Sequence, residues 1–353
     1  MRAESAANDR SAASEARAAN DGCTPSELNR THPSGAASTV RTVLGDIAPL
    51  GLGRVNYHEH LFQVSPLLPG DELSDERASA QEAALLLGSG FDSMIDATPV
   101  GLGRDPEAVA RISATTGLGV VATTGAHREA HYPQGHWLRD LGAEERGDLF
   151  LTDLTQGMAR RDGEATGALT PDGAPVPAGL LKAGIGYWSI TRFEHETLRG
   201  VAAAHRSTGA PVMVHLEFCT AAHEVLDILE EAGVAASRVV LAHADRDPNP
   251  LLHLDLVRRG AWLGYDGMAR PRTRSDSELL ALTEAVVSGG GADHILLGGD
   301  VARSSRYIAY GGMPGLAYLG ARYLPALQER IGVDTVQRIL RHNPQRFLPW
   351  SRA

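Results

Sequence analysis

The sequence predicts an α/β fold and, within that class, a (β/α)8 TIM barrel. From residue 39 onward, short apolar runs alternate with longer amphipathic segments, and such alternation is typical of a parallel sheet. The alternation repeats eight times, which is the number of units in a closed barrel. The first apolar run leads into "YHEHLF". A doubly wound sheet, the alternative fold, would normally have a glycine-rich phosphate-binding turn at that point.

Eight apolar runs are the expected strands, because each is short and is followed by a polar or glycine-containing segment. In chain order they cover residues 54–58, 93–98, 119–124, 180–185, 211–216, 238–243, 261–265 and 294–299. Helices are expected between them. The clearest helices are "RFEHETLRGVAAAHRSTG" and "AAHEVLDILEEAG", since each amphipathic pattern ends in glycine, a common stop signal.

Two stretches depart from this regular pattern. Residues 126–179 exceed an ordinary strand-to-helix connection, so we expect extra structure there, over the mouth of the barrel. Residues 1–38 are small, polar and mixed in charge, and they cannot bury enough apolar surface to offset the entropy of ordering. The sequence therefore predicts a disordered N-terminal tail over 1–38 and one TIM-barrel domain over 39–353.

Composition limits the partners of the chain. Its net charge is −10, which disfavours nucleic acid, since phosphate backbones require concentrated positive charge. No apolar run approaches the roughly 20 residues of a membrane helix. The two cysteines, Cys23 and Cys219, indicate no disulfide framework and suit a reducing cytoplasm. A small-molecule substrate is expected, and a homodimer is a possible assembly.

Polar and charged residues end several of the expected strands. His58 and His60 are two residues apart, so both imidazoles can face the same side of a strand, although an HxH pair alone is equally consistent with two surface histidines. Other strands end near Asp266 or in single ionisable residues. In a barrel these ends converge on one mouth, where catalytic groups collect. The set expected to bind metal is His58, His60, Lys182, His215, His243 and Asp300.

Lys182 is the single lysine among the 33 lysine and arginine residues of the chain, and it lies within an apolar run. Arginine cannot lose its proton in a protein, whereas a desolvated lysine can be neutral near pH 7. A neutral amine reacts with CO2 to form a carbamate, an anionic ligand with two oxygens that can bridge two metal ions. The alternative is an ordinary lysine that pairs with a carboxylate. The position of Lys182 between the HxH pair and His215 favours the carbamate.

These residues predict a site for two divalent metal ions. With four neutral histidines, the carbamate, Asp300 and a bridging hydroxide, the site keeps a net positive charge, which suits stabilisation of a developing oxyanion. The bridging hydroxide is the expected nucleophile, and Asp300 is the expected catalytic residue that accepts its proton. Zinc is the expected metal, and manganese, cobalt and iron also accept such ligands.

The sequence resembles the phosphotriesterase family of the amidohydrolase superfamily over residues 40–348. The resemblance lies in "YHEHLF", "LLKAGIGYWSITRFEHETLRG", "AHADRDPN", "LGGDVARSSRYIAYGGMPGL" and "NPQRFL". It implies His58 and His60 on the first metal, His215 and His243 on the second, carboxylated Lys182 as the bridge, and Asp300 completing the first. Within the family the sequence is most similar to lactonases that act on phosphorylated sugar lactones.

That resemblance also implies a clamp for a substrate phosphate, formed by Arg272 and Arg303. The group tends to have lysine at position 272 and tyrosine at position 306, so Arg272 and Arg306 are departures that leave the particular sugar open. Chance placement in loops is the alternative explanation for these arginines, and for Arg270. The stretch "GAHREAHYPQGHW" differs from the family pattern. His127 and His131 there, and the hydroxyls of Tyr187 and Tyr310, are further candidate substrate contacts.

The expected function is hydrolysis of a lactone, with an anionic or phosphorylated sugar lactone as the first candidate. Three alternatives remain open. One is hydrolysis of a phosphotriester or carboxylic ester at the same metal centre, and another is amide hydrolysis. The third is a non-catalytic barrel that binds a small molecule, which the complete set of six metal-site residues disfavours.

Overall fold

The computed structural model describes residues 38–350. Most of the tail predicted over 1–38 lies outside these residues. Eight parallel strands form a sheet whose order follows the chain, from β3 to β10. The strands are β3 (Val55–Glu59), β4 (Ser93–Asp96), β5 (Gly119–Gly125), β6 (Leu180–Gly184), β7 (Val212–His215), β8 (Val239–Ala242), β9 (Trp262–Tyr265) and β10 (Ile295–Leu297).

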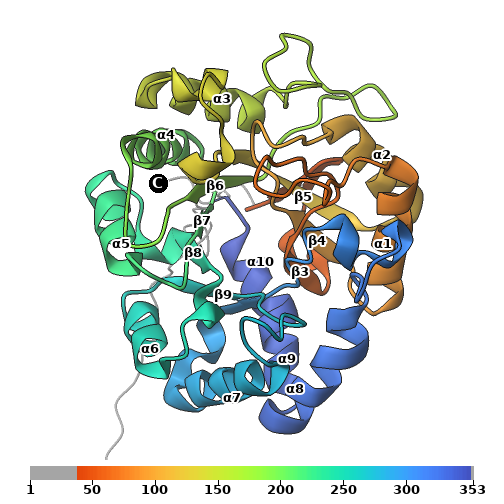
Figure 1. Cartoon of the computed structure of the whole chain (residues 1–353), viewed down its shortest axis with the longest axis vertical. Coiled ribbons are helices and arrows are strands. Elements are labelled where there is room, and N and C mark those ends of the chain that lie inside the picture. Colours follow the sequence, from red (N-terminus) through yellow and green to blue (C-terminus); the bar gives the residue numbers. More distant parts are fainter. Residues whose placement is uncertain (1–37, 351–353) are drawn as a thin grey trace, which may run out of the picture. The chain divides into compact units, whose positions relative to one another are not determined.

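Helices surround the sheet, and Figure 1 shows them as an outer ring around the strands. They are α1 (Glu76–Gly88), α2 (Pro106–Thr116), α3 (Ala143–Thr155), α4 (Arg192–Thr208), α5 (Ala222–Glu231), α6 (Pro250–Arg258), α7 (Asp276–Val286), α8 (Leu324–Ile331), α9 (Val333–Gln337) and α10 (Asn343–Phe347). The (β/α)8 TIM-barrel prediction is confirmed. Among the described residues, no helix combines the length and the apolar character needed to cross a membrane.

The last strand meets the first through backbone hydrogen bonds. The amide of Asp300 donates to the carbonyl of His58 at 2.8 Å, just beyond the end of β10. Asn56 and Glu59 reinforce this seam, since they accept hydrogen bonds from the amides of Gly299 (3.2 Å) and Val301 (3.0 Å). The seam therefore fixes Asp300 beside β3.

The inside of the barrel is filled by apolar side chains from alternating strand positions. Leu180 and Met213 belong to this inner cluster. Lys182 and His215 follow them by two residues, so they face the same interior one layer nearer the carboxyl ends of the strands. Phe347 and Leu348 join the inner cluster, so the end of α10 packs beneath these strands.

Helix ends follow the sequence signals. Gly209 ends α4 in the left-handed conformation, with φ 76°, and its amide donates to the carbonyl of His205. At the start of α4, the hydroxyl of Thr191 accepts a hydrogen bond from the amide of Glu194, and the Glu194 carboxylate accepts one from the amide of Thr191. Such reciprocal capping satisfies amides that have no partner within the helix.

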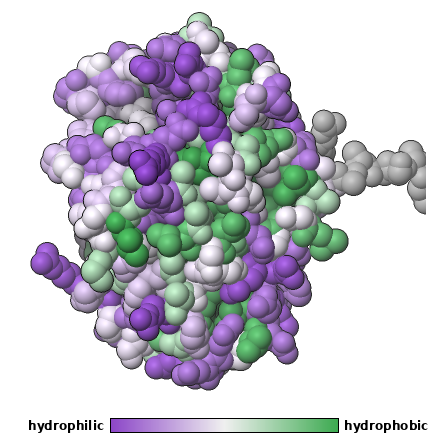
Figure 2. Space-filling view, turned by 90° about the vertical axis from the view of Figure 1, so that its right-hand side faces the viewer, coloured by the Kyte–Doolittle hydropathy of each residue, from purple (hydrophilic) through white to green (hydrophobic). Residues whose placement is uncertain are grey.

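A short antiparallel pair, β1 (Val40–Thr42) and β2 (Gly45–Ile47), precedes the barrel and was not predicted. The expectation for 126–179 holds only for its first residues, since His127, Arg128 and His131 line the pocket at the barrel mouth. Among the later residues, α3 packs against α4, where Nη1 of Arg146 donates a hydrogen bond to the carbonyl of Phe193 at 2.7 Å. The loop after α3 lies beside α2, where Arg160 contacts Glu107 at 3.1 Å, and Figure 1 shows this loop at the periphery. Seen toward α1 and α2, the surface mixes hydrophilic and hydrophobic residues (Figure 2).

Candidate functional site

A pocket of about 640 Å³ opens at the carboxyl ends of the strands. All six residues of the expected metal set line it. His58, Lys182 and His215 belong to β3, β6 and β7, whereas His60, His243 and Asp300 follow the ends of β3, β8 and β10. Each of the six is buried, with at most 6% of its surface exposed. Buried ionisable groups of this kind require partners or a metal.

His58, His60 and Asp300 form one group. Oδ1 of Asp300 lies 3.7 Å from Nε2 of His58 and 3.6 Å from Nε2 of His60. Two ligands that each lie about 2.0–2.1 Å from one tetrahedral ion are about 3.4 Å apart. The spacing therefore suits three ligands around a single divalent cation, and these three residues form a group that could hold a metal ion.

The other nitrogen of each of these histidines is occupied by a protein partner. Nδ1 of His58 lies 3.1 Å from Asp266, and Nδ1 of His60 lies 2.7 Å from the Thr98 hydroxyl. Partners of this kind orient an imidazole and leave Nε2 free as a ligand atom. The sequence indicates Asp266 only as a residue near a strand end, and neither its contacts with histidines nor the contact of Thr98 was predicted.

His215 and His243 form a second pair on the neighbouring strands. Nδ1 of His215 lies 2.8 Å from Nε2 of His243. Their remaining nitrogens contact carboxylates, with Glu217 3.0 Å from Nε2 of His215 and Asp266 2.6 Å from Nδ1 of His243. Nδ1 of His215 and Nε2 of His243 thus face one another, and each ring is oriented by the carboxylate that contacts its other nitrogen.

Burial favours the neutral form of His60, His215 and His243. It lowers the pKa of His60 to about 3 and that of His243 to about 4, and it lowers the pKa of His215 well below its ordinary value. At Asp266 burial favours the protonated acid, but hydrogen bonds from His243 and His58 outweigh it and lower the pKa. Neutral imidazoles beside an ionised carboxylate are the protonation states that metal binding requires.

Lys182 lies at the bottom of the pocket, with 1% of its surface exposed. Its Nζ donates a hydrogen bond to the carbonyl of Ala97 at 2.7 Å. Burial lowers the pKa of the amine to about 8, so a substantial fraction is neutral near physiological pH. Gly125 of the neighbouring strand β5 pairs with Lys182. A Cβ at position 125 would lie 1.9 Å from the carbonyl oxygen of Lys182.

Asp300 has a left-handed backbone conformation with φ 42°. Its Oδ1 faces the two Nε2 atoms, and its Oδ2 accepts a hydrogen bond from Nη2 of Arg270 at 2.6 Å. Burial alone would raise the pKa of Asp300, but Arg270 and His58 hold it well below its usual value. The carboxylate is therefore ionised.

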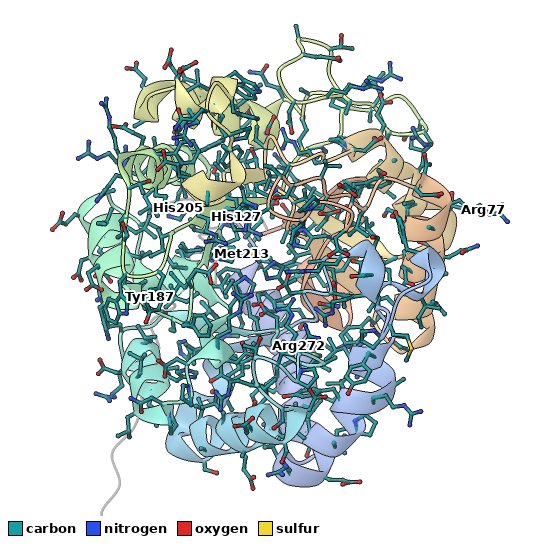
Figure 3. The ribbon with its side chains drawn as sticks, in the orientation of Figure 1. Arg77, His127, Tyr187, His205, Met213 and Arg272 are labelled. Carbon is teal, nitrogen blue, oxygen red and sulfur yellow. The ribbon has the colours of Figure 1, made fainter. Side chains whose placement is uncertain are left out.

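The expected substrate contacts fall into two groups. Arg272, Arg303, Arg306 and His127 line the pocket, and so do His131 and Arg270. Tyr187 does not line it, is 62% exposed and has its ring 6.3 Å from that of Phe218. Figure 3 shows His127 and Arg272 nearer the centre of the barrel than Tyr187. The Tyr310 hydroxyl contacts Ser79 and Asp75 at 2.9 Å, outside the pocket.

Three charged pocket residues were missed by the sequence analysis, namely Arg128, Glu217 and Arg246. Glu217 comes two residues after His215, and Arg246 comes three residues after His243. Because the residues that immediately follow barrel strands form the mouth, their positions after β7 and β8 were an available signal. Arg128 comes three residues after the end of β5, so the same signal applied to it.

A closed parallel barrel with buried histidines, a lysine and a carboxylate at its carboxyl end defines the class of TIM-barrel hydrolases. The chain belongs to the phosphotriesterase family, whose sequence model matches residues 38–348. Enzymes of this family are binuclear metal hydrolases. The chain is therefore a hydrolytic enzyme that acts on ester or amide bonds of small molecules, and the predicted family and enzyme class are confirmed.

Relatives of the chain span more than one hydrolytic activity. The chain is 29% identical to a phospho-furanose lactonase of Mycoplasmopsis synoviae over 332 residues, covering 88% of this chain and 92% of the relative. It is 27% identical to an N-acetyltaurine hydrolase of Danio rerio over 360 residues, covering 88% and 98%. The crystal structure of a lactonase from Listeria monocytogenes aligns with a TM-score of 0.79 and 28% identity, covering 89% of this chain and all of that one.

Proposed function

We propose that this enzyme is a metal-dependent lactonase that opens an anionic sugar lactone, with a phosphorylated one as the first candidate. The observation that carries the proposal is the charge of the pocket. Arg270, Arg272, Arg303 and Arg306 line it together with the histidines, in a chain whose net charge is −10. A cationic cleft in an acidic protein attracts and orients an anionic substrate.

The donor set fits a pair of divalent ions. His58, His60 and Asp300 would hold one, since Nε2 of each of these two imidazoles lies within 3.7 Å of Asp300. His215 and His243 would hold the other through Nδ1 and Nε2, which face one another at 2.8 Å. Lys182 would link the two after its neutral Nζ attacks CO2, forming an N–C bond and releasing a proton from nitrogen. Zinc is the first candidate, with manganese, cobalt and iron as alternatives.

Bound divalent ions supply Lewis acidity and make a coordinated water easier to deprotonate. The residues of the chain have the other roles. Oδ2 of Asp300 accepts the proton of the attacking water and passes it to the alkoxide that leaves the lactone. Arg270 contacts this same oxygen, so it sets how readily Asp300 takes up the proton. Arg272 and Arg303 bind the phosphate of the substrate, and His127 contacts its sugar.

Amide hydrolysis is the second candidate, and the N-acetyltaurine hydrolase relatives favour it. N-acetyltaurine carries a sulfonate, so its anionic group would suit the same arginines. The two candidates differ in the leaving group, which is an alkoxide in a lactone and an amine in an amide. The metal pair and Asp300 would have the same roles in both.

A substrate panel tests the proposal. It compares kcat/KM for phosphorylated sugar lactones, the same lactones without phosphate, N-acetyltaurine, an acyl-homoserine lactone and a paraoxon-like triester. We expect the phosphorylated lactones to be hydrolysed best, and Arg303→Glu to lower their kcat/KM at least tenfold while the unphosphorylated lactone changes little. Preference for N-acetyltaurine would establish the second candidate instead. An unchanged kcat/KM in Arg303→Glu would show that the phosphate binds elsewhere.

A further inference from the structure

Two arginines on the β5–β8 side of the pocket have no role in the proposed function. Arg128 follows β5, and Arg246 ends the short helix Ala244–Arg246 that follows β8. Both line the pocket. Their side chains are 28% and 16% exposed, so they are largely desolvated and yet reach the cavity.

Neither guanidinium is satisfied by its protein neighbours. Nη2 of Arg128 lies 3.3 Å from Glu217, and its buried Nε has no partner among the described residues. Arg246 lies 3.6 Å from Glu217 and 3.6 Å from Oδ2 of Asp300, which is too long for a hydrogen bond. Each guanidinium offers five N–H donors, so most of them are free to bind a ligand.

Arg104 provides a comparison, because its guanidinium is engaged by protein carboxylates. Arg104 is also buried, but its Nε and Nη2 donate to Asp162 at 2.7 Å and to Asp153 at 2.8 Å. Two carboxylates therefore hold Arg104 tightly. By comparison, Arg128 and Arg246 both lie near Glu217, which also contacts His215. The other carboxylate near Arg246 is that of Asp300, which already accepts a hydrogen bond from Arg270. Positive charge therefore remains on this side of the pocket.

The position of Arg246 relates this charge to the reaction. Nη2 of Arg246 lies 3.6 Å from Oδ2 of Asp300, and its Nη1 lies 3.6 Å from Glu217. Arg246 therefore lies beside Oδ2 of Asp300, the atom that would transfer the proton. Hydrolysis of a lactone adds water oxygen to the carbonyl carbon, breaks the bond to the ring oxygen and transfers a proton to that oxygen. The acid that results loses its own proton at neutral pH, because a carboxyl group has a pKa of about 4. In the proposed reaction the new carboxylate would lie near Asp300 and therefore near Arg246.

We propose that Arg128 and Arg246, held in place by Glu217, form a subsite for the carboxylate that hydrolysis generates. This subsite is separate from Arg272 and Arg303, which follow β9 and β10 and would bind the phosphate already present in the substrate. The inference rests on the proposed function only in requiring a carboxylic ester, lactone or amide as substrate, since each of these leaves a carboxylate. Charge-assisted hydrogen bonds from two guanidiniums would give the product higher affinity than the uncharged substrate group has there.

Binding of a simple product-like acid tests the subsite directly. Gluconate is titrated calorimetrically into metal-loaded enzyme, and glucitol, which has a hydroxyl in place of the carboxylate, is the matched ligand. We expect Arg246→Met to weaken gluconate binding about tenfold and the Arg128→Met/Arg246→Met double variant to weaken it further. Glucitol binding should change little. Arg258→Met, at an exposed arginine of α6, is the control variant.

Metal content and thermal melting are measured for every variant, and Arg246→Gln replaces Arg246→Met if the latter is unfolded. A second readout is product inhibition. The inhibition constant of the product should rise in the double variant, and by a larger factor than the KM for the phosphorylated lactone rises. Unchanged gluconate affinity in a folded, metal-loaded double variant would overturn the subsite. Lack of activity on every lactone would refute the lactonase proposal but leave the gluconate titration as an independent test.

Discussion

Oδ1 of Asp266 lies 2.6 Å from Nδ1 of His243, and Oδ2 of the same carboxylate lies 3.1 Å from Nδ1 of His58. One buried acid therefore holds an imidazole from each of the two groups proposed to bind metal. Since the tautomer and direction of both rings depend on it, Asp266 couples the two groups.

Asp266→Asn should weaken metal binding by about 10- to 100-fold, the range found when a residue that orients a metal-binding histidine is replaced. The amide can accept from one ring only through its single oxygen, and its NH2 group faces the other ring as a donor. Metal titration followed by calorimetry measures the loss. Asp255→Asn, an exposed carboxylate on α6, is the control, and equal metal affinity in the two variants would contradict this role.

Lys182→Arg should reduce metal content from about two ions per chain to about one or fewer, and activity should fall with it. Arginine retains the positive charge but cannot form a carbamate. Metal analysis of the purified variant provides the measurement. A Lys182→Arg enzyme that retains two ions and normal turnover would show that no carbamate is needed.

Removal of the metal ions by a chelator should abolish hydrolysis, and addition of zinc, manganese or cobalt salts should restore it. Thermal melting should also shift downward, since a ligand that binds only the folded state stabilises it. Activity and melting temperature are followed together. Full activity in protein shown by elemental analysis to hold no metal would exclude the proposed chemistry.

Stability should fall as pH is lowered from about 6.5 to about 4, in part because of His253. This side chain is fully buried, and burial lowers its pKa to about 4, against about 6.5 in the unfolded chain. Between these values the unfolded state binds the extra proton, so the free energy of unfolding decreases by up to about 1.4 kcal/mol per pH unit for this histidine.

The measurement is urea unfolding of metal-free protein across that pH range, for the native chain and for His253→Gln. The variant should show a shallower dependence of unfolding free energy on pH. His342→Gln, at an exposed histidine, should leave the dependence unchanged. Identical slopes for the native chain and His253→Gln would show that His253 is not kept neutral by burial.

Gly299→Ala should destabilise the chain by about 1–3 kcal/mol, as overpacking of a closed site does. A Cβ at this position would meet Oε1 of Glu59 at 2.0 Å, at the seam that holds Asp300. Chemical denaturation gives the stability, and kcat should fall because Asp300 shifts. Gly88→Ala, where a Cβ has open space, is the matched control. Equal free energies of unfolding for the two variants would show that the contact between β10 and β3 accommodates the added methyl group without loss of stability.

Much of the fold was available in the sequence. The number and order of the strands follow from the alternation of apolar runs with amphipathic segments, and the observed β5 (Gly119–Gly125) and β6 (Leu180–Gly184) differ from the expected runs by one residue at one end. The short pair β1 and β2 was missed because each strand has three residues, too few to establish a period of two.

The candidate site, like the fold, was predictable from the sequence only in part. His58, His215 and Asp300 were identifiable because each comes at or just after the end of an apolar run, and barrel geometry brings such ends together. Lys182 was identifiable as the single lysine of the chain, within an apolar run. The partners of these residues could not be identified. Thr98 and Asp266 lie 38 and 208 residues from the histidines His60 and His58 that they contact, so these contacts exist only once different strands lie side by side.

What the sequence determined by itself is therefore the repeating unit, the class of the barrel and the residue types at the strand ends, because these depend on local periodicity. Tertiary structure alone decided which nitrogen of each histidine faces the pocket, which arginines are satisfied and which are free, and how Asp300 is held. Those properties depend on hydrogen-bond partners tens to hundreds of residues apart, such as Asp266 and His58, and on burial, which shifts the pKa of Lys182 to about 8.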